Sequence, residues 1–96
     1  MHKLYILIKD GMAVGLQAAQ GTHAAVQYVL DNPNQTWNND TLVLLECNNL
    51  RKYTKKIKYS GLEYTEFREP NQDNIVTSIA VYAETNIFKK LPLIGT

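Results

Sequence analysis

The sequence predicts a small α/β domain built around one β-sheet, and two observations lead to this class. Short apolar runs rich in strand-forming residues alternate with two stretches whose apolar residues recur at a helical period. Their order along the chain is strand, helix, strand, helix, strand, strand. Because parallel strands need right-handed crossovers, this order implies a sheet in a two-layer or three-layer arrangement. We expect residues 1–96 to form a single domain with one core.

The first strand and the first helix have the clearest patterns. Residues 3–10, KLYILIKD, lack polar alternation, which predicts a central strand covered on both faces. A glycine-punctuated loop follows, and residues 15–30, GLQAAQGTHAAVQYVL, predict a helix that stops before Pro33. An apolar stripe on this helix consists of Leu16, Ala19, His23, Val26 and Leu30.

The second strand and the second helix follow a polar loop. Residues 40–48, DTLVLLECN, predict another buried strand. Residues 50–60 predict a helix, because Asn48 or Asn49 can cap its start and Gly61 fits just past its end.

Two further strands complete the predicted sheet. Residues 62–67, LEYTEF, alternate as a strand does, and residues 76–84, VTSIAVYAE, form the last strand. The loop of residues 68–75 joins them, so we expect these two strands to pair. The tail after residue 84 predicts one short helical turn before Pro92.

Composition excludes several classes of protein and site. The run LYILI is far shorter than the roughly 20 residues of a membrane span and lacks a signal cleavage site, so we expect a cytoplasmic protein. The lone Cys47 rules out a disulfide framework and favours a buried small hydrophobe. His2, His23 and the scattered acids lack metal-ligand spacing, and we expect no metal or organic cofactor. Trp37 favours a lid over the core rather than a base-stacking platform.

The charges are unevenly distributed along the chain. Residues 51–58, RKYTKKIK, hold five of the ten Lys and Arg residues and none of the nine acids. Such a cluster is either a footprint for nucleic-acid phosphates or, more commonly, a solvated helix face. The candidate phosphate contacts are Arg51, Lys52, Lys55 and Lys56.

The first helix carries a motif that resembles a known family. In VGLQAAQGTHAAV, residues 14–26, the glycine, the Ala-Ala-Gln and the Thr-His-Ala-Ala steps are similar to the signature of archaeal and eukaryotic-type peptidyl-tRNA hydrolases, the peptidyl-tRNA hydrolase 2 family. FREPNQDNIVTSIAVYAE, residues 67–84, is similar to that family's acidic loop and last strand. The resemblance implies a four-stranded mixed sheet flanked by helices, and hydrolysis of the ester that joins a peptide to tRNA.

The chain also departs from the family pattern. The family usually has lysines on both sides of Gly15, where this chain has Val14 and Leu16. It usually has an aspartate where Glu69 stands, and the loop before Thr77 is shortened here. This compact, lysine-poor form is similar to divergent members found in phage genomes, which implies the host cytoplasm as the location.

The candidate site combines one helix start with one loop. A helix N-terminus preceded by a glycine loop favours an anion, and the next two turns supply polar side chains that include an imidazole, the side chain suited to proton transfer near neutral pH. A carboxylate in the loop between the last two strands would orient or deprotonate water. The catalytic candidates are His23, Glu69, Thr22 and Thr77. The substrate-binding candidates are Gly15, Gln20 and Asp73, together with the four basic residues of the second helix.

Each candidate has a simpler alternative. His23 belongs to the apolar stripe and would then be a core-facing imidazole bonded to a carbonyl. Gln20 and Thr22 would be helix-to-strand hydrogen-bonding groups, Glu69 a solvated turn residue, and Thr77 an ordinary strand residue.

Three functions fit these residues. The first is a peptidyl-tRNA hydrolase-like esterase in which Glu69 prepares water and His23 assists. The second is a phage-type hydrolase that cleaves a small cyclic nucleotide at its phosphodiester, and the third is a non-catalytic protein that sequesters a nucleotide or RNA. The expected partners are therefore tRNA or a small nucleotide, and the chain is compatible with a homodimer but not with membrane insertion.

Overall fold

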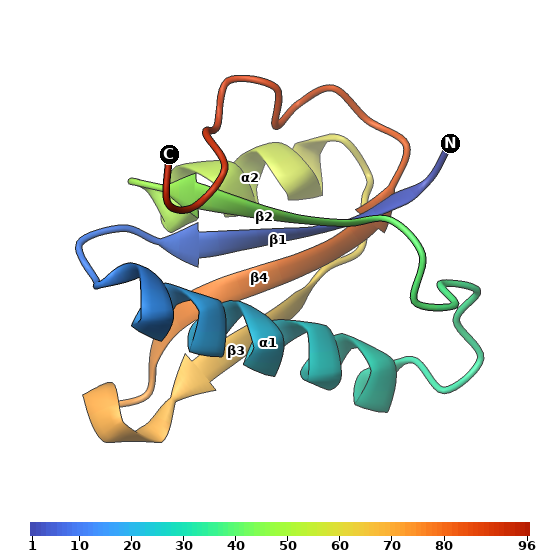
Figure 1. Ribbon diagram of the computed structural model, residues 1–96. Helices are drawn as coiled ribbons and strands as arrows, with labels where there is room; N and C mark the ends of the chain where they lie inside the picture. The colour runs from blue at the N-terminus through green and yellow to red at the C-terminus, as the bar shows by residue number, and fades with distance from the viewer.

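A four-stranded mixed β-sheet lies between two helices in the computed structural model, which describes all 96 residues (Figure 1). The elements in chain order are β1 (Lys3–Lys9), α1 (Val14–Asp31), β2 (Leu42–Cys47), α2 (Leu50–Tyr59), β3 (Thr65–Glu69), the 3₁₀ turn η1 (Pro70–Gln72) and β4 (Ile75–Ala83). The predicted class, the element order and the four mixed strands are confirmed. Neither helix combines the length and the apolarity that crossing a bilayer demands.

The strands lie in the order β2-β1-β4-β3. β1 pairs in parallel with β2 and antiparallel with β4, and β3 and β4 form an antiparallel hairpin. β1 is therefore central, as its unbroken apolar run predicted. α1 covers one face of the sheet, while α2 and the C-terminal tail cover the other, which gives three layers (Figure 1).

The two faces of the sheet carry separate cores. The core beneath α2 consists of Leu7, Leu45, Cys47, Tyr53, Ile57, Ile79, Val81, Ala83 and Phe88. The core beneath α1 consists of Leu4, Ile6, Ile8, Ala24, Trp37 and Ala80. Trp37 closes the second core and donates its indole N–H to the Thr41 carbonyl at 3.1 Å, so its predicted place as a lid is confirmed.

Helix α2 begins and ends as expected. The Asn49 side chain accepts the Lys52 N–H at 3.0 Å, and Gly61 follows the helix with a φ of +73°. The start of β3 at residue 62 was wrong, because the Leu62 N–H bonds the Ile57 carbonyl at 3.1 Å and so closes the helix instead of joining the sheet.

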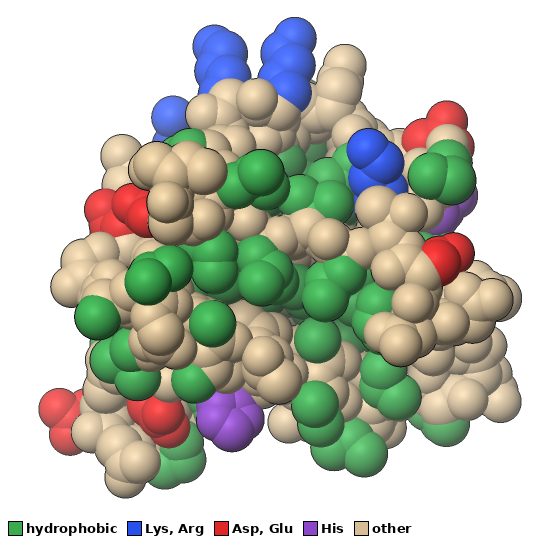
Figure 2. All heavy atoms as spheres, viewed as in Figure 1, with side chains coloured by type: hydrophobic (Ala, Val, Ile, Leu, Met, Phe, Trp, Pro, Cys, Tyr) green, Lys and Arg blue, Asp and Glu red, His purple; other side chains and the backbone are tan.

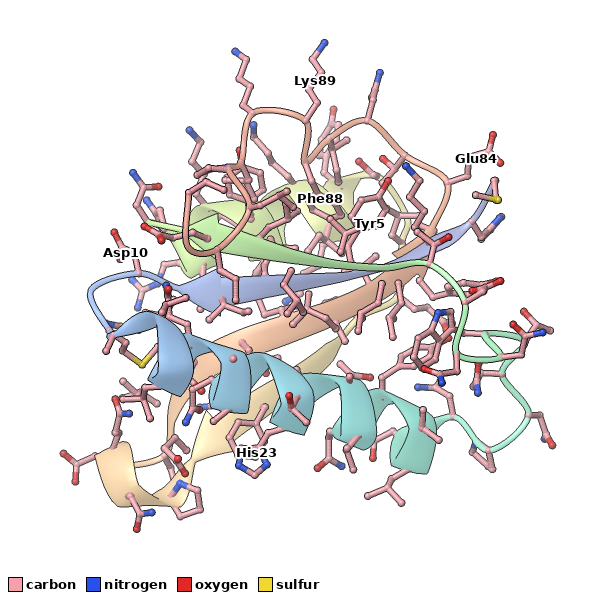
Figure 3. The ribbon with its side chains drawn as sticks, in the orientation of Figure 1. Tyr5, Asp10, His23, Glu84, Phe88 and Lys89 are labelled. Atoms are coloured by element: carbon pink, nitrogen blue, oxygen red, sulfur yellow. The ribbon has the colours of Figure 1, made fainter.

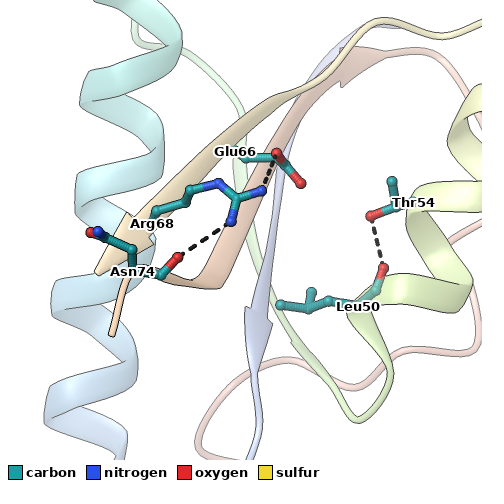
Figure 4. A network of polar contacts seen from close by, with 5 residues as sticks. All are labelled: Leu50, Thr54, Glu66, Arg68 and Asn74. Carbon is teal, nitrogen blue, oxygen red and sulfur yellow. Dashed lines mark hydrogen bonds and ion pairs between the residues drawn. The ribbon is translucent and has the colours of Figure 1, made fainter. Parts of the chain in front are cut away.

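The hairpin loop is more ordered than predicted. Its residues form η1 and then two left-handed positions, Asp73 and Asn74, with φ values of 56° and 59°. Arg68 holds this turn, because its guanidinium donates to the Asn74 carbonyl at 3.3 Å and to Glu66 at 3.5 Å (Figure 4).

The C-terminal tail forms turns and then joins the sheet. In place of the predicted helical turn, Lys89 N–H bonds the Asn86 carbonyl and Leu91 N–H bonds that of Phe88. The tail next runs antiparallel to β2: Glu46 N–H bonds the Pro92 carbonyl at 2.8 Å, and Ile94 N–H bonds the Leu44 carbonyl at 3.1 Å. The outer edge of β2 is thereby covered, and β3 supplies the free edge of the sheet.

The face that α1 buries differs from its predicted apolar stripe. The buried residues are Gln17, Gln20, Gly21 and Ala24, whereas Leu16, Val26 and Leu30 are 46%, 52% and 68% exposed. A Cβ on Gly21 would lie 2.6 Å from Ile8 Cδ1, so glycine here allows the helix to approach β1 closely. The core-facing alternative for His23 is therefore wrong, because its side chain is exposed rather than buried.

Two alanine substitutions in α1 test this close approach. Gly21→Ala gains up to about 1 kcal/mol of helix propensity but must displace the buried Ile8, at a cost of about 1–3 kcal/mol. Gly15→Ala gains propensity only, because nothing lies within 4 Å of its new Cβ. Urea unfolding should therefore rank Gly15→Ala above Gly21→Ala by about 1–3 kcal/mol. Equal stabilities would contradict the close approach.

Candidate functional site

A buried glutamine of α1 connects the helix to β3 and β4. Gln20 is 1% exposed, and its Nε2 donates to Glu69 Oε1 at 2.9 Å. Its Oε1 accepts from the Thr77 hydroxyl, and its backbone carbonyl accepts from the Ser78 hydroxyl at 2.7 Å. We call Gln20, Glu69, Thr77 and Ser78 the Gln20 cluster. Every polar group of Gln20 that faces the sheet is thus paired.

A β-bulge lets two consecutive strand residues reach the same glutamine. Neighbouring side chains of a regular strand point to opposite faces. Between Phe67 and Arg68 the pairing of β3 with β4 shifts by one residue, so Thr77 has no partner on β3. Thr77 and Ser78 consequently both point towards α1.

The cluster fixes the orientation of the amide. With Oε1 towards the Thr77 hydroxyl, the Gln20 NH₂ group faces the Glu69 carboxylate, whereas the flipped amide would place an oxygen against that carboxylate. Glu69 is half-buried, and its Oε2 has no partner in the chain. One oxygen of this carboxylate is therefore held, while the other is free.

His23 lies at the same helix-strand interface, one turn after Gln20. Its ring stacks on Phe67 with centroids 4.6 Å apart and planes inclined by 14°. The residue is exposed, and its ring nitrogens have no hydrogen-bond partner in the chain (Figure 3). Stacking orients the imidazole, and exposure leaves its nitrogens free for a substrate.

Three other predicted residues are not members of the Gln20 cluster. Thr22 is exposed and donates its hydroxyl to the Ala18 carbonyl at 2.8 Å, within its own helix. Asp73 is exposed and follows η1 with a positive φ, a left-handed backbone conformation that is typical of a turn residue. Gly15 lies at the start of α1, also exposed. Gly15 and Thr22 make no side-chain hydrogen bond with Gln20 or Glu69. Asp73 lies in the same turn as Glu69, whose carbonyl accepts the Asn74 N–H at 3.0 Å.

The expected anion site at the helix N-terminus does not coincide with the cluster. α1 begins at Val14, and no side chain caps it. At about 1.5 Å per residue, Gln20 and His23 lie roughly 8 and 12 Å along the axis from Gly15. The helix start and the Gln20 cluster are therefore separate positions along α1, and anion binding at the helix start stays a prediction.

The basic helix lies on the opposite face of the sheet. Arg51, Lys52, Lys55 and Lys56 are exposed on α2, whereas the Gln20 cluster is beneath α1. Figure 3 shows His23 below α1 and Lys89 beyond the sheet on the other side. The predicted site thus divides into two surfaces.

Within the Gln20 cluster, Glu69 alone is partly exposed, whereas Gln20, Thr77 and Ser78 are buried. None of the main hollows is lined by Gln20, His23 or Glu69. A hollow of roughly 380 Å³ between α1 and β2 includes Gly21 and Thr22, but its other lining residues are mostly apolar. Figure 2 shows hydrophobic side chains, coloured green, gathered across the middle of this face.

Sequence reasoning missed Phe67, Ser78 and Gln17. Gln17 is 3% exposed and donates to the Lys9 carbonyl at 3.2 Å, which fastens the helix start to β1. The signal for Ser78 was available, because Thr-Ser interrupts an otherwise apolar strand. Phe67 carried no signal, since its contact depends on how α1 crosses β3.

Comparisons with known proteins support the fold alone. No family model and no curated protein matches the sequence. Among solved structures, the chain is similar to Atu0240, a protein of unknown function from Agrobacterium tumefaciens strain C58. The TM-score is 0.71 at 13% sequence identity, and the match covers 96% of each chain. The architecture is therefore shared with another protein, without information on activity.

Paired substitutions test the connection between Gln20 and Thr77. Gln20→Leu and Thr77→Val each leave a buried polar partner unpaired, so each should lower the free energy of unfolding by about 1–3 kcal/mol. The double variant should be more stable than the sum of the single losses predicts, by about 0.5–3 kcal/mol, as measured by urea unfolding. Gln27→Leu, which removes a surface bond to Asp31, is the control and should change stability by less than about 0.5 kcal/mol. Strict additivity would contradict the connection.

The buried cysteine yields a second prediction. Cys47 is 1% exposed, as expected from sequence, and burial raises the pKa of its thiol. A raised pKa and poor access both disfavour reaction through the thiolate. A water-soluble thiol reagent should therefore leave the native protein unmodified and react after unfolding in urea. Rapid modification of the folded protein would contradict this burial.

Proposed function

We propose that the protein is a peptidyl-tRNA hydrolase-like esterase that uses water to cleave the ester between a peptide and tRNA. One observation carries the proposal: the Gln20 amide holds one oxygen of Glu69 and leaves the other free, and His23, one turn after Gln20 on the same helix, is exposed and oriented by its stack on Phe67. A held carboxylate and an exposed imidazole at one helix-strand interface are suited to acid-base chemistry on a bound ester. The resemblance of residues 14–26 to the family motif supports the same reaction.

The reaction assigns a separate task to each group. The free oxygen of Glu69 accepts a proton as water attacks the ester carbonyl. The carbon-oxygen bond to the ribose then breaks, and the departing ribose oxygen takes a proton from His23. Gln20 and Thr77 are positioning residues, because they hold the carboxylate and do not contact the ester.

The lack of a main hollow at Glu69 and His23 favours a large substrate over a small one. Sites for small molecules are usually concave and bury most of the ligand. The Gln20 cluster lines no main hollow, so a cyclic nucleotide would have little to enclose it, whereas a tRNA brings its own extended contact area.

A basic path leads from α2 towards Glu69. A hollow of roughly 510 Å³ at the free edge of β3 is lined by side chains of both α2 and β3. Its charged members are Arg51, Lys55, Lys58, Glu66 and Arg68. Arg68 immediately precedes Glu69. In this proposal, tRNA phosphates follow these cations around the edge, and Lys52 and Lys56 extend the contact.

Matched substitutions test the chemistry. With peptidyl-tRNA as substrate, Glu69→Gln and His23→Asn should each lower kcat by roughly 10²- to 10⁴-fold while far-ultraviolet circular dichroism stays native. Glu63→Gln, an exposed carboxylate outside the hollow between α2 and β3, and His2→Asn near Tyr82 are the controls, and both should retain near-native turnover.

The remaining outcomes decide among the three functions. The wild-type protein is assayed by chromatography with peptidyl-tRNA and with several cyclic nucleotides. Turnover of a cyclic nucleotide alone would replace the proposal with the small-nucleotide hydrolase. Binding of either ligand without turnover would replace it with the non-catalytic binder.

A further inference from the structure

A groove on the α2 side of the molecule carries four lysines from two separate segments. It lies between the end of α2 and the turn of residues 86–90, and it has a volume of roughly 550 Å³. Its lysines are Lys55, Lys56, Lys89 and Lys90, and no acidic residue lines it. We call it the lysine groove. Figure 2 shows long basic side chains projecting from this end of the molecule.

Both walls of the groove are anchored in the core. On the tail side, Phe88 is 2% exposed, and its ring lies 5.1 Å from that of Tyr5 and 6.2 Å from that of Tyr53. The turn around Phe88 directs Lys89 away from the body (Figure 3). On the helix side, Tyr53 and Ile57 are buried. The backbone segments that carry the four lysines are therefore held in place by these buried side chains.

The charge of the groove is not neutralised within the chain. The two ion pairs of the structure join Met1 to Glu84 and Arg68 to Glu66, so neither involves a lysine. Several like charges around one hollow repel each other, and a bound polyanion relieves this repulsion while releasing its counterions.

An exposed aromatic ring completes the groove. Tyr59 lines it and is 96% exposed, the largest exposed fraction among the large hydrophobic side chains. The Tyr59 side chain buries almost no surface on folding, so packing does not explain its presence. A free aromatic face beside cations is the arrangement on which nucleic-acid bases stack.

We propose that the lysine groove binds single-stranded RNA, with phosphates on the four lysines and a base stacked on Tyr59. An acidic peptide or an anionic membrane would also neutralise the lysines, but neither offers planar bases to Tyr59. The inference deepens the proposed function, because the groove would grip the RNA part of the substrate, and it extends the basic contacts of α2 to Lys89, Lys90 and Tyr59. None of the residues that line the lysine groove belongs to the Gln20 cluster.

Binding of a short RNA tests the groove. The probe is a fluorescent oligouridylate of about ten nucleotides, followed by anisotropy at several salt concentrations. Lys89→Gln with Lys90→Gln should weaken binding and lower the slope of log affinity against log salt by up to about two units, one per lost phosphate contact. Tyr59→Ala should weaken binding by about 5- to 150-fold, and Tyr59→Phe should restore most of it.

A matched control separates local contact from overall charge. Lys3→Gln with Lys9→Gln removes the same charge from β1, outside the groove, and should leave RNA affinity nearly unchanged. Equal losses in the two double variants, or no RNA binding by the wild-type protein, would overturn the proposal. Binding to phosphatidylserine vesicles in place of RNA would also overturn it.

One variant separates this inference from the proposed hydrolysis. Glu69→Gln alters the opposite face of the sheet, so it should bind the RNA probe as the wild-type protein does. RNA binding through the groove without any ester hydrolysis would retain the groove and reject the hydrolase. Ester hydrolysis that is insensitive to the groove variants, in a protein that does not bind the probe, would do the reverse.

Discussion

The contact of α1 with the sheet at Gln20 and Gly21 is the constraint on which the rest of this face depends. Gly21 lets the helix backbone approach Ile8, and at that distance the neighbouring glutamine side chain has to enter the interior. An unpaired buried amide would cost about 1–3 kcal/mol, so partners are required on the sheet. Thr77 and Glu69 are the partners of the amide, and the Ser78 hydroxyl pairs with the Gln20 backbone carbonyl. The position of the Glu69 carboxylate therefore follows from how closely a helix packs.

The two helices attach to the sheet by different means. α2 uses buried Tyr53 and Ile57 and leaves its cations in water, which is ordinary amphipathic packing. α1 instead buries two glutamines, one glycine and one alanine, and leaves large aliphatic side chains exposed. This inversion explains why polar chemistry gathers beneath α1 and positive charge gathers on the α2 side. The proposed hydrolysis and the proposed RNA binding at the lysine groove thus lie on opposite faces of the sheet.

Sequence patterns were sufficient for the elements and insufficient for their contacts. Local signals such as the Asn49 cap, Gly61 and the apolar run of β1 predicted boundaries well, because each acts within a few residues. The predicted start of β3 was wrong because the Leu62 N–H bonds a helix carbonyl instead of a neighbouring strand. No local sequence pattern indicates which of these two partners is preferred. Within the site, Gln20, His23 and Glu69 were named from sequence and lie at one interface. The wrong face of α1 has a different origin, since apolar periodicity assumes that large side chains decide packing.

The pairing of the tail with β2 bears on how the chain acquires its structure during synthesis. β1 and β2 can pair early during synthesis. The second edge of β1 remains unpaired until β4 has been synthesised, and the outer edge of β2 remains unpaired until residues 92–94 have been synthesised. Contacts between segments so far apart in sequence are slow to form, because loop closure must precede them. A nascent chain that has emerged only to α2 thus has two strands with open edges and no completed sheet. We expect folding to be a late, cooperative event that follows emergence of residues 92–94 from the ribosome.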